Sequence, residues 1–146
     1  MENQTTLINE LASDETTKKK LLQKLAAQSL VKSKDNFLAF VKTFAPKLVA
    51  DFKMGRHIEV ISEKLQKVEE GELKRLMVFL PPRSSKSVIC SKLFPAWYLG
   101  RHPKHEILSV SHSDTLASDI GRSVRDLVGS GLYQNVFRGV KLRSDV

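Results

Sequence analysis

Cysteine and long apolar runs are scarce in this sequence, and each scarcity excludes a class of protein. Cys90 is the only cysteine among 146 residues, so the chain has neither a disulfide framework nor a cysteine cluster for zinc. No stretch approaches the roughly 20 consecutive apolar residues of a membrane-spanning helix. The residues from Met1 to Leu11 also lack the apolar run of a signal peptide. These absences predict a protein of a reducing, cytoplasmic compartment.

Basic residues are in excess. Lys and Arg number 24 against 16 Asp and Glu, which gives a formal net charge of +8. This balance favours an anionic partner, with nucleic acid or a nucleotide as the first choices. The densest basic run, Lys18–Lys20, is also typical of a solvated helix face.

Apolar residues recur at helical spacing in the first half of the chain and predict three helices. The expected helices run from near Asp14 to Leu30, over Asp35–Phe44 and over Arg56–Val68. The first of them would have its apolar side at Leu21, Leu22, Leu25 and Leu30. Pro46 should limit the second helix, and Gly71 should end the third.

The pattern changes after Gly71. Leu76–Leu80 is a continuous apolar run of strand length. Ile107, Leu108 and Val110 predict a second strand over Glu106–Ser111. The expected helices are Ser87–Leu99 and one that begins at Ser113 or Asp114 and ends at Gly129. Pro95 should bend the first of these helices. Alternation of strand and helix is the βαβ pattern, so the sequence predicts an α/β fold with parallel strands.

The segment Pro81–Ser87 joins the first expected strand to its helix, which is the setting of a phosphate-binding loop. Lys86 could reach the β and γ phosphates, and the hydroxyl of Ser87 could hold Mg²⁺. The prolines have no N–H, so backbone donors have to come from Arg83 onward, through Ser84 and Ser85. The full pattern has glycine where this chain has Leu80 and Ser85. A serine-rich turn with a solvated lysine is the alternative interpretation.

Three blocks of sequence resemble one family when they are taken in order. They are Leu76–Ser87, Phe94–Gly100 and Ser109–Arg125. Together they are similar to the N-terminal ATPase region of phage terminase large subunits, the motors that thread DNA into viral capsids. The resemblance extends from Gly55 to Phe137.

The resemblance implies a fold, partners and a setting. The fold would be a P-loop NTPase-type parallel sheet with flanking helices, incomplete and preceded by N-terminal helices. Residues 1–50 would form the helical segment and residues 51–146 the front part of the ATPase domain. The implied cofactors are ATP and Mg²⁺, and the implied partners are double-stranded DNA, the portal and the small terminase subunit. A homo-oligomeric ring in the host cytoplasm, transiently at the capsid portal, is the implied assembly.

The resemblance also implies residue roles. Lys86 would be the loop lysine, Ser87 the Mg²⁺ ligand and Arg83 a sensor or stabiliser of the γ-phosphate. An ion pair with a neighbouring carboxylate is the alternative for Arg83. His57 would contact the adenine edge, unless it is a helix cap or a surface residue. Arg122 and Arg125 share a helix face that would meet DNA or a neighbouring subunit, unless that face is only solvated.

Hydrolysis of ATP needs one more motif, an apolar strand that ends in Asp-Glu. Only Arg138–Val146 follow Phe137, and they contain no such strand. We therefore expect an N-terminal fragment that lacks the hydrolysis motif and the family's nuclease domain and is not a competent motor alone. The second hypothesis is a non-enzymatic basic module that binds nucleic acid or a partner protein and has a degenerate phosphate loop.

Overall fold

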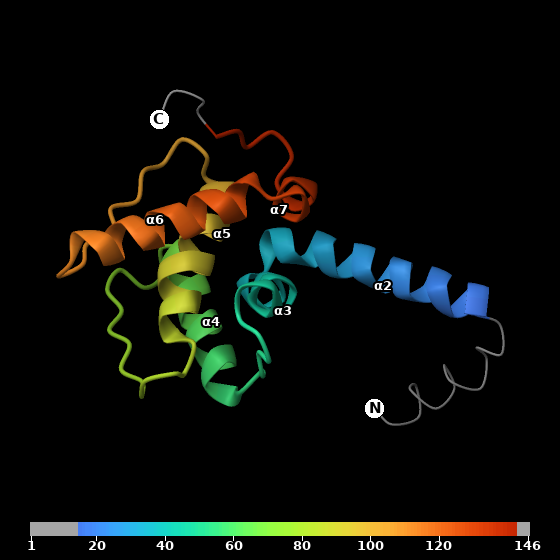
Figure 1. Ribbon diagram of the computed structural model, residues 1–146, viewed down its shortest axis with the longest axis horizontal. Coiled ribbons are helices and arrows are strands. Elements are labelled where there is room, and N and C mark those ends of the chain that lie inside the picture. Colours follow the sequence, from blue (N-terminus) through green and yellow to red (C-terminus); the bar gives the residue numbers. More distant parts are fainter. Residues whose placement is uncertain (1–14, 143–146) are drawn as a thin grey trace.

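The computed structural model describes residues 15–142, which form a helical body with one long helix projecting from it (Figure 1). The elements are α2 (Glu15–Asp35), α3 (Phe37–Leu48), α4 (Arg56–Glu69), the π-helix η1 (Val88–Leu93), α5 (Phe94–Arg101), α6 (Asp114–Gly129) and α7 (Gly131–Val136). None of these helices is long and apolar enough to cross a membrane.

The core is built around α3. Its aromatic residues Phe37, Phe40 and Phe44 stand three and four positions apart, so they share one face, and all three are fully buried. Trp97 of α5 and Tyr133 of α7 pack against them. The polar atoms of these two rings are satisfied. Trp97 Nε1 donates to the carbonyl of Ser33 at 3.0 Å, and the Tyr133 hydroxyl donates to the carbonyl of Ala96 at 2.7 Å. The core therefore combines residues of both predicted segments, 1–50 and 51–146.

Helix ends follow the local capping chemistry. The side chain of Asn36 accepts from the N–H of Ala39 and begins α3, and Ser113 caps α6 in the same way. Gly71 follows α4 at φ 79°, in the left-handed region that glycine adopts without strain. The expectation for Pro46 was wrong, because α3 includes this proline and continues to Leu48.

The helix that contains Pro95 changes its hydrogen-bonding pattern instead of breaking. Proline has no N–H and crowds the carbonyl four residues before it. The six residues from Val88 to Leu93 form a π-helix, and Phe94 N–H bonds to the carbonyl of Ile89, five positions back. This wider turn directly precedes the proline, and α5 continues from it to Arg101.

The predicted α/β fold with a P-loop-type parallel sheet is wrong for residues 15–142, which contain no strand. Leu76–Leu80 does alternate like a strand, since Leu76, Val78 and Leu80 lie against the core while Met77 and Phe79 are about 80% exposed. Glu106–Ser111 is exposed along most of its length. Within the described residues, no backbone hydrogen bond joins these two segments. An alternating apolar segment can have an extended backbone, but a β-strand also needs backbone hydrogen bonds to a neighbouring strand.

The first helix also departs from expectation. Leu22 and Leu25, predicted for its apolar side, are 58% and 49% exposed, because this part of α2 extends beyond the body (Figure 1). Leu30, closer to the body, does pack against the core. Asp14, the predicted cap, lies outside the described residues.

Candidate functional site: the loop before the π-helix

The loop from Pro81 to Ser85 enters a continuous helical segment that starts at Lys86. The Ser84 hydroxyl donates to the carbonyl of Pro81 at 2.8 Å, which closes the loop on itself. Arg83 and Ser85 both have left-handed backbones, with φ of 62° and 60°. When right-handed and left-handed backbone conformations alternate along a loop, neighbouring N–H groups point to the same side. They then form a concave surface that binds anions.

The start of the helix adds donors to this concavity. The Ile89 N–H bonds to the carbonyl of Ser85 at 3.1 Å, so the N–H groups of Lys86, Ser87 and Val88 precede the first bond of the helix. No acidic residue occupies the first turn of η1. The partial positive charge of the helix N-terminus is therefore not neutralised by a carboxylate of its own first turn.

Lys86 and Ser87 border a hollow of about 400 Å³ beside the loop. The remaining lining residues are Leu65, Val68, Leu76, Val78, Cys90 and Ser91. Burial raises the pKa of the Cys90 thiol, and the positive charge of Lys86 offsets this only in part. Cys90 is therefore a neutral lining residue of this hollow.

The structure brings some of the predicted site residues together and leaves others apart. Arg83 is exposed on the loop and forms no ion pair within residues 15–142. The ring of His57 packs against the backbone of Gly55. A Cβ atom at position 55 would lie 2.7 Å from His57 Cε1. No hydrogen bond among the described residues links His57 to the loop. Within that same part of the chain, no group of three or more His, Cys, Asp or Glu could hold a metal ion.

The two arginines of α6 lie on an exposed surface. Arg122 Nη1 is 3.1 Å from Asp119 Oδ1, and both side chains are more than half exposed. Arg125, one turn further along, is also exposed. Their predicted contact with DNA or a neighbouring subunit stays a prediction.

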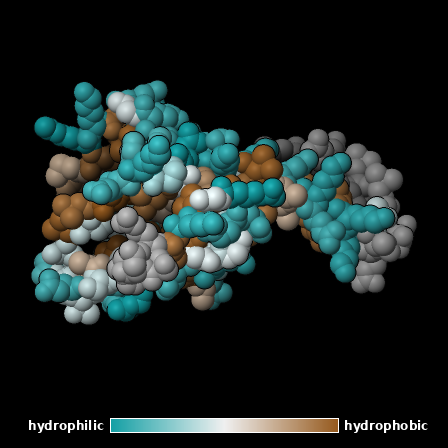
Figure 2. All heavy atoms as spheres, turned by 90° about the horizontal axis from the view of Figure 1, so that it is seen from above, coloured by the Kyte–Doolittle hydropathy of each residue, from teal (hydrophilic) through white to brown (hydrophobic). Residues whose placement is uncertain are grey.

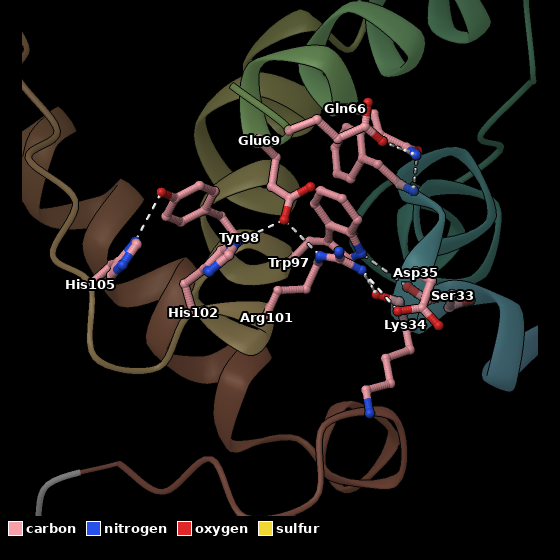
Figure 3. A network of polar contacts seen from close by, with 12 residues as sticks. Ser33, Lys34, Asp35, Gln66, Glu69, Trp97, Tyr98, Arg101, His102 and His105 are labelled. Atoms are coloured by element: carbon pink, nitrogen blue, oxygen red, sulfur yellow. Dashed lines mark hydrogen bonds and ion pairs between the residues drawn. The ribbon is translucent and has the colours of Figure 1, made fainter. Parts of the chain in front are cut away.

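Sequence reasoning missed a second polar group, at the C-terminal ends of α4 and α5 (Figure 3). Glu69 Oε1 lies 2.7 Å from both Arg101 Nε and His102 Nε2, and Arg101 Nη1 is 2.9 Å from Asp35 Oδ1. The guanidinium of Arg101 also stands 5.2 Å from the ring centre of Trp97. Burial acts to raise the pKa of Glu69, but the hydrogen bonds and charge of Arg101 and His102 outweigh it and hold the pKa below its usual value.

This group extends to the surface. The Tyr98 hydroxyl is 3.0 Å from His105 Nδ1, and the rings of His102 and His105 stack at 4.9 Å. Asp35, Arg101 and His102 also border a hollow of about 1120 Å³ that residues of α2 and α7 line further. The contacts of the group join the ends of three helices and so stabilise the fold. The only signal in the sequence was the position of Glu69, Arg101 and His102 just beyond the ends of two predicted helices.

Comparison with protein-family models, with curated proteins and with solved structures gave no match.

Proposed function

We propose that this chain binds the phosphates of Mg²⁺–ATP at Arg83–Ser87 and serves as the ATP-binding front portion of a viral DNA-packaging motor of the terminase type. The observation that carries the proposal is the left-handed backbone of Arg83 and Ser85 directly before a helix whose first turn has no acidic residue. This geometry directs several N–H groups and a helix N-terminus to one place.

Two side chains would add charge to these backbone donors. Lys86 would pair with the β and γ phosphates, and Arg83, exposed and without an ion pair among the described residues, is available to a phosphate oxygen. The Ser87 hydroxyl would act through the metal, since Mg²⁺ prefers oxygen ligands and is usually bound together with the nucleotide's phosphates. The proposal depends on this loop and its helix, and it requires no sheet.

The wider role rests on the three ordered blocks that resemble terminase large subunits and on the charge of +8. In that role the motor couples ATP hydrolysis to the movement of double-stranded DNA into a capsid. The proposed partners are DNA, the portal and the small terminase subunit.

Ser85 gives a direct test of the loop. A left-handed backbone costs a serine roughly 1 kcal/mol relative to glycine, so Ser85→Gly should hold the loop ready for phosphate more of the time. We expect Mg²⁺–ATP to bind about fivefold more tightly, which corresponds to the same energy. Titration calorimetry measures the affinity, and Ser109→Gly, which makes the same change at an exposed position outside the loop, is the control. An unchanged affinity for Ser85→Gly would overturn the proposal.

The second candidate, a non-enzymatic basic module with a degenerate loop, is favoured by a different observation. The helix α2 carries six lysines and is acidic only at its two ends. This candidate predicts that wild type and Ser85→Gly show the same weak ATP binding while both bind DNA. The calorimetric comparison therefore separates the two functions.

A further inference from the structure

The outer part of α2, residues 17–26, forms an arm that extends away from the helical body (Figure 1). Its surface is largely hydrophilic in Figure 2. No Asp or Glu lies between Glu15 and Asp35, but the helix has six lysines, Lys18, Lys19, Lys20, Lys24, Lys32 and Lys34. All six are exposed, and within the described residues none of them forms an ion pair.

The hydrogen bonds that hold α2 to the body all lie at its other end. The carbonyl of Ser33 accepts from Trp97, the carbonyl of Lys34 accepts from Arg101, and Asp35 pairs with Arg101. A helix without tertiary packing depends on its intrinsic propensity and on favourable pairs three or four residues apart. The arm has the opposite arrangement, because Lys20 and Lys24 are four residues apart and repel each other. An anionic partner would remove this repulsion.

The distribution of lysines around the arm identifies the kind of anion. Successive residues are rotated by about 100°, so Lys18, Lys19 and Lys20 point to three different sides. The helix face that carries Leu21, Leu22 and Leu25 has Lys18 before them and Gln28, Ser29 and Lys32 after them, so its apolar stripe spans little more than one turn. Helices that lie in a membrane interface need a continuous apolar face. The arm is therefore suited to a polyanion that it contacts through charge.

We propose that the α2 arm binds the phosphate backbone of duplex DNA through Lys18, Lys19, Lys20 and Lys24. The charge argument stands without the ATP site, but the choice of duplex DNA among polyanions rests on the proposed function. Contacts of lysines to phosphates release condensed counterions, so they contribute affinity that falls steeply with salt and has no sequence preference. The arm would hold DNA near the body without selecting a site.

The experiment compares two variants of equal net charge in the full chain. The arm variant replaces Lys18, Lys19, Lys20 and Lys24 with Gln. The control replaces four exposed lysines of the body or its loops, Lys42, Lys47, Lys53 and Lys64. Lysine and glutamine have similar helix propensities, so circular dichroism should match wild type for both. Duplex DNA binding is measured without nucleotide by fluorescence anisotropy over a range of salt concentrations.

We expect the arm variant to bind duplex DNA roughly tenfold or more weakly. The slope of log affinity against log salt concentration should be shallower by about 3.6 units, at ~0.9 for each of the four phosphates that a lysine no longer neutralises. The control should stay within about one unit of wild type. Equal reductions of affinity in both variants, an unchanged arm variant or a wild type that does not bind DNA would each overturn the inference.

A second measurement tests whether wild type binds vesicles of phosphatidylcholine with and without phosphatidylglycerol. Binding of wild type to the anionic vesicles but not to DNA would also overturn the inference and assign the arm to a membrane surface. DNA and ATP are titrated separately. Failure of the DNA result with ATP binding intact removes only this inference, and the reverse outcome removes only the ATP site.

Discussion

Glu69 Oε1 lies 2.7 Å from Arg101 Nε, and the carboxylate side chain is only 4% exposed, so one charged contact joins the end of α4 to the end of α5. Arg101 also pairs with Asp35, the last residue of α2. Three helix ends therefore meet at one guanidinium. The end of α2 is also held nearby by the hydrogen bond from Trp97 Nε1 to the carbonyl of Ser33.

Replacing Glu69 with Gln should destabilise the fold. Glutamine is nearly the same size but lacks the charge, and charge-assisted hydrogen bonds are worth about 1.5–3 kcal/mol against about 0.5–1.5 kcal/mol for neutral ones. We expect the free energy of unfolding, measured by urea denaturation at neutral pH, to fall by about 1–2 kcal/mol. Glu72→Gln removes the same charge at an exposed position and should change it by less than about 0.5 kcal/mol.

The effect of Glu69→Gln should also depend on pH. The pKa of Glu69 is held below its usual value of 4.5 in the folded protein, so its contribution to stability is present above that pH and is lost as the pH falls further. The difference in unfolding free energy between wild type and Glu69→Gln should therefore shrink in acid. A difference that stays constant or grows as the pH falls would show that the carboxylate is not stabilised in this way.

Tyr133→Phe tests the buried hydrogen bond between α7 and α5. The hydroxyl donates to the carbonyl of Ala96 at 2.7 Å, and the ring is fully buried, so phenylalanine keeps the packing and removes only the hydrogen bond. We expect the unfolding free energy to fall by about 1 kcal/mol, and the melting temperature by about 2–4 °C. Tyr98→Phe, whose hydroxyl contacts His105 at the surface, is the control and should have a smaller effect.

The two extended segments should cause self-association. Phe79 and Leu108 are 80% and 89% exposed, and exposed apolar side chains favour contact between molecules. The double variant Phe79→Ser, Leu108→Ser should shift sedimentation equilibrium toward the monomer with little change in unfolding free energy. Leu22→Ser with Val31→Ser makes the same chemical change on α2. Equal shifts in the two double variants would mean that the segments are not the associating surface.

Elements with purely local causes could be predicted from the sequence. Periodic apolar residues and short capping side chains act within one or two turns, so the helices α3, α4 and α6 agree with prediction to within a few residues at most ends. The π-helix before Pro95 was predicted only as a bend, because the sequence shows that a proline must be accommodated but not by which pattern of hydrogen bonds.

The absence of strands from residues 15–142 could not be predicted, because strand pairing is not local. Leu76–Leu80 has the composition and alternation of a strand, and the described chain supplies no neighbour for its backbone. The contact of Glu69 with Arg101 spans 32 positions and depends on how two helices end side by side. The left-handed backbone at Ser85, in contrast, has a local signal in the sequence. The phosphate-loop pattern has glycine at this position, and glycine is the residue that favours a left-handed backbone.

The most direct test of the ATP site is the affinity of Lys86→Ala for a fluorescent ATP analogue with Mg²⁺. The substitution removes the charge aimed at the phosphates and leaves the backbone N–H groups in place. A charge-assisted contact of roughly 1.5–3 kcal/mol predicts an affinity lower by about one to two decades. Lys92→Ala, further along the same helical segment, should bind as wild type does, and Ser87→Ala should bind more weakly only when Mg²⁺ is present. Equal affinities of wild type, Lys86→Ala and Lys92→Ala would contradict the assignment of Arg83–Ser87 as the phosphate site.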